Sequence, residues 1–308
     1  MKRTIQMVGA TAILVIAVTV HAQQVQAQQI ENVEAAEAYN QARTLYQEGN
    51  YDEAKELLLK SARLESGNYR AHYLLGLTYQ RLRQADDAIA QFEAAVRFNP
   101  NYYQVYSAMA SVYLNSKNDT EQALVNYIKS GEVSESVGQP YWQAFFNQGK
   151  IYFDQLRWDE ALQAYSKVAQ YQPANETAFL MMGRVQVETG DYENAIMNFT
   201  QAATIKPTWM DPYFFQANVL NRLGQYEAAI VAADQALERM PGDGGSLFEK
   251  GMALKNQEKW DEAIAVLEQA ARDAQWRQNA NYQIEVIKNR DKYVDIPPDT
   301  GRTIPPVV

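Results

Sequence analysis

A repeat of 34 residues is the feature that most constrains how this chain can fold. Pro173, Pro207 and Pro241 are spaced at that interval, and each follows a stretch whose apolar residues have helical spacing. A second helical stretch precedes each of these, as "ETAFLMMGRVQVET" does before Pro207. Because proline cannot continue a helix interior, each unit is predicted to be two helices that stop before the proline. Such hairpins bury their apolar faces only when copies stack.

Small residues recur at fixed positions of the repeat. Position 8 is glycine or alanine in seven units, namely Ala42, Gly76, Ala110, Gly149, Gly183, Ala217 and Gly251. Position 20 is alanine in all seven, after a one-residue shift in the third: Ala54, Ala88, Ala123, Ala161, Ala195, Ala229 and Ala263. We expect these two positions to face each other where the two helices of a unit cross. Position 17 is a large ring in five units, and it is expected to fill the space beside the small residues.

This pattern resembles the tetratricopeptide repeat (TPR) family over roughly residues 35–275. The seven units begin at Ala35, Tyr69, Tyr103, Trp142, Glu176, Met210 and Gly244. The resemblance implies an all-α fold, a right-handed α-solenoid in which the first helix of each unit, helix A, lines the concave side. The second helix of each unit is called helix B below.

The third unit and the end of the array depart from the strict period. The third unit carries five extra residues, one in its turn and about four in 131–141 ("GEVSESVGQPY"), a segment predicted to protrude as a loop. Residues 276–294 have apolar side chains at helical spacing and are predicted to form a capping helix. Residues 295–308 contain four prolines, which predicts an extended tail without helix.

The N-terminus has the pattern of an export signal. Lys2 and Arg3 precede a run of 13 apolar residues, which is short for a membrane-spanning helix. Residues 1–22 are therefore predicted to be a signal peptide cleaved after Ala22 in preference to Ala27, and residues 23–34 a flexible leader. The protein would then be periplasmic or secreted. The alternative is an uncleaved segment that anchors it in the inner membrane.

Composition excludes several classes of function. The net charge of −9, which becomes −11 without Lys2 and Arg3, argues against nucleic acid as a partner. The chain has no cysteine, so thiolate catalysis and cysteine-ligated zinc are excluded. His72 would be the one histidine left, at a position where the other units carry packed side chains, so we expect a structural histidine. We predict no enzyme activity, no cofactor and no metal.

The surface of the A helices is the remaining candidate for function. In TPR proteins, partner contacts cluster at positions 2, 5, 9, 12 and 13 of helix A, and here these positions are rich in cations and rings. The predicted groove residues are Arg43, Arg70, Tyr73, Arg81, Phe146, Lys150, Phe153, Arg184, Phe214, Asn218 and Arg222. Arginine would pair with carboxylates and the rings would hold apolar side chains.

Two functions remain open from the sequence. The first is a non-enzymatic scaffold or adaptor that binds an acidic or mixed protein segment or extended peptide, in cell-envelope assembly. The alternative is a holdase-like chaperone or transport factor with broad affinity for envelope proteins. The resemblance to the TPR family is specific for the fold and says little about which of the two applies.

Overall fold

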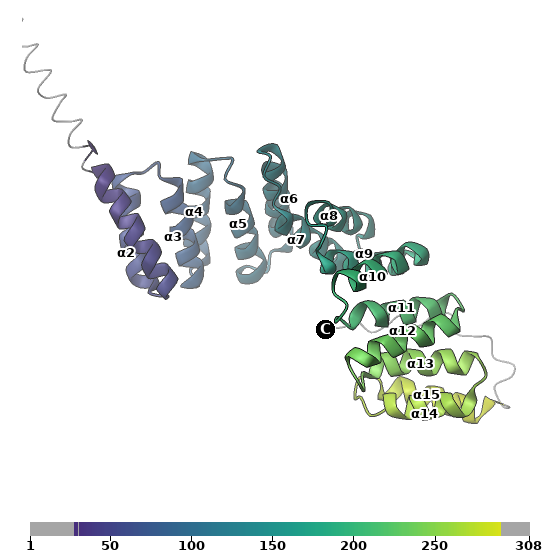
Figure 1. Cartoon of the computed structure of the whole chain (residues 1–308). Helices are drawn as coiled ribbons and strands as arrows, with labels where there is room; N and C mark the ends of the chain where they lie inside the picture. The colour runs from purple at the N-terminus through teal and green to yellow at the C-terminus, as the bar shows by residue number, and fades with distance from the viewer. Residues whose placement is uncertain (1–27, 30, 291–308) are drawn as a thin grey trace, which may run out of the picture. The chain divides into compact units, whose positions relative to one another are not determined.

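Helices follow one another along the chain in the order that the repeat predicts (Figure 1). The computed structural model describes residues 28–29 and 31–290, and every regular element in these ranges is helical. The predicted signal peptide and proline-rich tail lie outside the described residues. No helix within the described ranges is long and apolar enough to cross a membrane.

The chain divides into two units, Met1–Ile151 and Tyr152–Val308, which are described separately. The N-terminal unit contains a helix over residues 31–48, then α2 (Tyr51–Leu64), α3 (Tyr69–Arg81), α4 (Ala85–Phe98), α5 (Tyr103–Ser116) and α6 (Thr120–Ser136). The next helix, α7 (Trp142–Asp154), lies in this unit up to Ile151.

The C-terminal unit continues the pattern of helix pairs. It contains α8 (Trp158–Tyr171), α9 (Glu176–Thr189), α10 (Tyr192–Ile205), α11 (Asp211–Arg222), α12 (Tyr226–Arg239), α13 (Gly244–Asn256), α14 (Trp260–Ala270) and α15 (Arg277–Lys288). In both parts of the chain, helices pack on the next helix along the sequence, as α3 does on α4 and α9 on α10.

The helix boundaries agree with the repeat positions. Helices α3, α5, α7, α9 and α13 begin at the predicted first residue of their units, and α11 begins one residue later. Each position-17 ring, such as Trp158 or Tyr192, is the first residue of a B helix. The side chains of Asn68 and Asn175 accept hydrogen bonds from the first turns of α3 and α9, which explains why those A helices start there.

The small residue at position 8 faces a different partner from the one expected. The alanines at position 20 are buried, but the side chain nearest to Gly76, Gly183 and Gly251 is the one at position 24 of the same repeat. A Cβ atom added at Gly183 would lie 2.5 Å from a ring carbon of Phe199, and one added at Gly76 would lie 2.5 Å from Phe92. Glycine at position 8 therefore makes room for a ring from helix B.

The segment 131–141 is not a protruding loop, contrary to the prediction. Helix α6 continues to Ser136, and only the residues from 137 to 141 form the connection. The Ser134 hydroxyl donates to the Gly131 carbonyl oxygen (2.7 Å) and accepts from the Tyr141 N–H (3.0 Å). Val133 and Ser134 are buried, and no proline interrupts the segment until Pro140. The extra residues therefore extend the buried face of a helix.

The two ends of the described chain differ in how well they were predicted. Within the segment 276–294, predicted as a capping helix, the structure has α15 over Arg277–Lys288, whose Ala280, Ile284 and Ile287 are buried against α14. Residues 31–34, assigned to the flexible leader, instead form the first turn of a helix, and Glu34 pairs with Lys60 of α2 at 3.7 Å.

Candidate protein-binding surface

The groove cations of the N-terminal unit have no carboxylate partners among the described residues. Arg43, Arg70, Arg81 and Lys150 are exposed, and none of them forms an ion pair there. The Arg81 side chain only reaches the Tyr46 hydroxyl, at 3.5 Å, and Arg70 lies 5.5 Å from the Tyr69 ring centroid. These charges are free to meet acidic groups from another molecule.

Tyrosine rings lie beside these cations. Tyr73 is half-buried between Phe92 and Tyr102, with ring centroids 5.9 and 5.0 Å away, and burial raises the pKa of its phenol. Tyr102 in turn packs edge-on against Tyr69 at 5.2 Å. Phe146 packs on Trp142 of the same helix at 6.4 Å. Tyr73 thus lies on the same helix as Arg70 and Arg81, and Phe146 on the same helix as Lys150.

The C-terminal unit holds Arg184 between two aromatic rings. Its guanidinium carbon lies 4.9 Å from the centroid of Phe153 and 5.5 Å from that of Phe215. The only hydrogen-bond acceptor it meets in the described chain is the Met181 sulfur, at 3.6 Å. Burial lowers the pKa of Arg184, while Tyr165 and the nearby carboxylates of Glu188, Asp211 and Asp154 act in the opposite direction. The Arg184 guanidinium is therefore half-buried and has no carboxylate in hydrogen-bonding contact within the described residues.

Two predicted groove residues are used for packing in this structure. Phe214 is only 7% exposed and lies against Phe215 and Trp276, with centroids 5.1 and 6.2 Å away. Asn218 is 8% exposed, and its amide donates to Glu249. Burial therefore removes both from the surface that a partner can reach. Arg222, by contrast, is exposed.

A buried carboxylate that the sequence reading missed joins α11 to α13. Glu249 is 5% exposed, and its Oε1 accepts from Asn218 at 2.8 Å. Its Oε2 accepts from Asn221, also at 2.8 Å. Burial raises the pKa of Glu249, and the two amides and the charge of Arg222 partly offset this. The two asparagines at neighbouring helix A positions were the one sequence signal that pointed to such a cluster.

This carboxylate predicts a pH dependence of stability. Because the pKa of Glu249 is raised in the fold, the folded state binds the proton more tightly than the unfolded state does. The contribution of Glu249 to the free energy of unfolding should then fall as pH rises from about 4.3 through the raised pKa, by at most about 1.4 kcal/mol per pH unit.

Urea unfolding of the wild type and Glu249→Gln across this range measures the effect, because the variant lacks the titration. The free energy of unfolding of the variant should rise relative to that of the wild type as pH rises. A difference that is constant with pH would contradict the assigned burial effect. Other carboxylates titrate in both proteins and cancel in the comparison.

His72 has the structural role that was expected, although it is half-buried rather than fully enclosed. Its ring stacks on Phe98 at 5.7 Å, Nδ1 lies 2.8 Å from Gln91 Oε1, and Nε2 lies 3.0 Å from the Ser66 carbonyl oxygen. In the described part of the chain, no group of three or more histidine, aspartate or glutamate side chains is arranged to hold a metal ion.

Comparison with protein families supports the repeat assignment directly. Tetratricopeptide repeat models match residues 39–124 and 142–175. The chain is a tetratricopeptide repeat protein. A model described as the TT21 fifth ARM repeats domain, another array of stacked helices, matches residues 176–287 of this TPR protein. Among curated proteins, no sequence relative matches.

Solved TPR structures share its fold. The C-terminal part of a TPR repeat-containing protein from Cytophaga hutchinsonii has a TM-score of 0.62 at 15% identity, covering 76% of this chain and 94% of that chain. YrrB, described as a TPR protein with an unusual peptide-binding site, has a TM-score of 0.53 at 20% identity. The match covers 65% of this chain and 97% of YrrB. PilF of Pseudomonas aeruginosa has a TM-score of 0.53 at 19% sequence identity, and the match covers 70% of this chain and 97% of PilF. TPR arrays are protein-interaction scaffolds, generally without catalytic activity, and this chain has that fold.

Proposed function

We propose that this TPR protein is a non-enzymatic adaptor that binds an acidic or mixed protein segment along its A helices. The observation that carries the proposal is Arg184, a half-buried guanidinium held between Phe153 and Phe215 without a carboxylate ligand. Aromatic stacking fixes its position before a partner arrives, so binding loses little side-chain entropy. A carboxylate placed there would gain charge-assisted hydrogen bonds in a partly desolvated setting.

The contrast with other cations on the same unit supports this assignment. Lys206 pairs with Glu176 at 3.3 Å and Lys250 with Asp234 at 2.6 Å, so carboxylates of this chain do neutralise nearby lysines. Arg184 and Arg222 form no ion pair within the described residues, although the charge of Glu188 acts on Arg184 and that of Arg222 acts on Glu249. Because the whole chain is acidic, an acidic partner would be repelled elsewhere and directed to these cations.

The proposal places the protein outside the cytoplasm, in the periplasm or secreted, with a role in cell-envelope assembly. Its support is the predicted signal sequence of residues 1–22, and the alternative is retention by that segment in the inner membrane. The length of the protein purified from an envelope fraction tests this, since cleavage after Ala22 would make Gln23 the first residue.

Charge reversal tests the adaptor function. The triple variant Arg70→Glu, Arg184→Glu, Arg222→Glu should lose partner binding by tenfold or more for each essential contact, since a charged hydrogen bond contributes about 1.5–3 kcal/mol. Partners are first identified by affinity purification from envelope extract with quantitative mass spectrometry. Their affinities for both proteins are then measured by calorimetry.

A matched variant separates the site from the overall charge. Arg63→Glu, Arg97→Glu and Arg272→Glu together make the same charge change at exposed arginines outside the predicted groove residues. The affinity of this control for the partner should fall by no more than twofold, and circular dichroism should show that both variants are folded. Equal loss in the two variants would overturn the proposed site, and enrichment of many unfolded clients would favour a holdase instead.

A further inference from the structure

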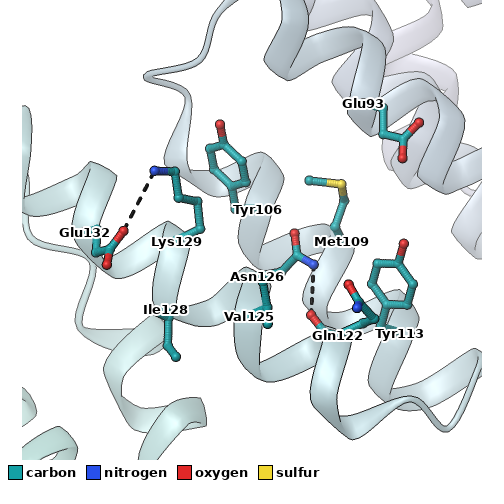
Figure 2. Close-up of a pocket in the computed structure, with 10 residues that line it drawn as sticks. All are labelled: Glu93, Tyr106, Met109, Tyr113, Gln122, Val125, Asn126, Ile128, Lys129 and Glu132. Atoms are coloured by element: carbon teal, nitrogen blue, oxygen red, sulfur yellow. Dashed lines mark hydrogen bonds and ion pairs between the residues drawn. The ribbon is translucent and has the colours of Figure 1, made fainter.

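A pocket in the N-terminal unit lies apart from the predicted groove residues. It has a volume of about 540 Å³ and lies among α4, α5 and α6 (Figure 2). Its α5 residues, Tyr106, Met109 and Tyr113, occupy positions 4, 7 and 11 of the repeat. Helical spacing places those positions on the opposite side of an A helix from positions 2, 5, 9, 12 and 13, which carry the groove residues.

The two ends of the pocket differ in charge. At one end Lys129 pairs with Glu132 at 3.8 Å, beside Tyr106 (Figure 2). At the other end, Glu93 of α4 lies near Tyr113. Glu93 is exposed and forms no ion pair or hydrogen bond with any described residue. The Glu93 end therefore carries a carboxylate without a cation.

The repeat itself indicates what is missing beside Glu93. Glu93 occupies position 25 of its unit, and position 7 of the next unit packs against position 25 in several places along the chain. In the C-terminal unit, Asp234 at position 25 accepts from Lys250 at position 7, at 2.6 Å. Thr200 accepts in the same way from Gln216, at 2.8 Å.

In the N-terminal part of the chain, Met1–Ile151, one pair of side chains at positions 25 and 7 is apolar on both sides, and the next pair is not. Leu59 at position 25 and Leu75 at position 7 belong to one apolar cluster. In the following pair, Glu93 and Met109 both line the pocket, and Met109 is buried and uncharged. Glu93 is thus an acidic side chain at position 25 that, unlike Asp234, has no lysine at position 7 of the next repeat.

We propose that this pocket is a second docking site, which receives a lysine or arginine side chain from a basic segment of a partner protein. The incoming cation would pair with the Glu93 carboxylate as Lys250 pairs with that of Asp234. The Tyr113 ring would flank it, since tyrosine faces attract cations. Val125, which is 57% exposed at the pocket, offers a contact for an apolar neighbour of that cation.

The site would make the adaptor bifunctional, with cationic A-helix surfaces for an acidic segment and this pocket for a basic one. The inference stands independently of the groove, because none of the predicted groove residues lines the pocket. Each surface can therefore fail its own test without deciding the other.

Binding of a defined basic probe tests the pocket. The probe is a fluorescein-labelled five-residue peptide with blocked ends in which valine alternates with arginine, titrated into the full chain and followed by fluorescence anisotropy. Saturable binding is expected for the wild type. Glu93→Gln should weaken it about tenfold, because a charge-assisted contact is lost.

Two further variants make the test specific. Glu121→Gln changes the same charge at an exposed site of α6 outside the pocket lining, and it should alter the affinity less than twofold. Met109→Lys would supply the absent cation from within the chain and should also abolish probe binding. Wild-type affinity in either Glu93→Gln or Met109→Lys, equal losses in both glutamine variants, or no saturable binding by the wild type would overturn the proposal.

Discussion

Replacing Gly183 by alanine is expected to destabilise the protein, although alanine is the better helix former. The propensity gain in a helix interior is about 1 kcal/mol. Against it, the new methyl group would lie 2.5 Å from the ring of Phe199, which is fully buried and has no free space to move into. Overpacking of this kind costs about 1–3 kcal/mol or more. We expect a net loss of about 2 kcal/mol, measured as a lower urea midpoint.

A double-mutant cycle with Phe199→Ala identifies the cause. That single change should cost about 3–5 kcal/mol by leaving a cavity. The double variant should lose no more stability than Phe199→Ala alone, because the clash is gone and the helix propensity gain of alanine remains. The sixth unit already pairs Ala217 with Ala233 at these positions, both buried.

A glycine with space around it serves as the matched control for the Gly183 experiment. Gly67 lies outside the helices, and a Cβ there would meet no atom closer than 4.0 Å, so Gly67→Ala should change stability by less than about 1 kcal/mol. An increase in stability from Gly183→Ala by itself would show that the two helices separate freely, and would contradict the close-packed crossing.

Shortening the Ile287 side chain in the capping helix α15 is expected to cause a comparable loss of stability at the C-terminal end of the described array. Ile287 is 1% exposed and belongs to the same buried cluster as Leu254 and Leu267. Ile287→Ala should cost about 2–5 kcal/mol. Because a terminal unit has a neighbour on one side only, the loss should be concentrated in α13–α15. Hydrogen exchange should then show faster exchange there first.

An exposed position on the same helix provides the comparison for the cap. Gln278 is exposed, so Gln278→Ala should stay within about 0.5 kcal/mol of the wild type. If Ile287→Ala leaves both the urea midpoint and the exchange of α13 unchanged, α15 does not stabilise the end of the array.

Local sequence was sufficient to predict most of the helices and where the B helices with a position-17 ring begin. Trp158, Tyr192 and Trp260 each begin a B helix, as their repeat position indicated. The capping helix was predicted from apolar spacing alone. These features depend on periodicity and on stop signals a few residues away, which a single stretch of chain contains.

The corrections came where the outcome depends on residues far apart in the sequence. Segment 131–141 was predicted as a loop because its length breaks the period, yet Val133 and Ser134 are buried. Phe214 was assigned to the surface from its position, but Trp276, from the end of the array, packs against it. Burial of this kind cannot be derived from a helical pattern.

The sequence by itself determined that the chain is an array of helical hairpins, because a 34-residue pattern of small residues, rings and prolines admits few other ways to bury its apolar faces. Only the tertiary structure decided which side chains meet between units. Packing of one repeat on the next placed Arg184 near two rings, enclosed Glu249 with two asparagines, and left Glu93 without a cation at the edge of a pocket. Those contacts depend on distances across the stack, and they are the ones on which the proposed functions rest.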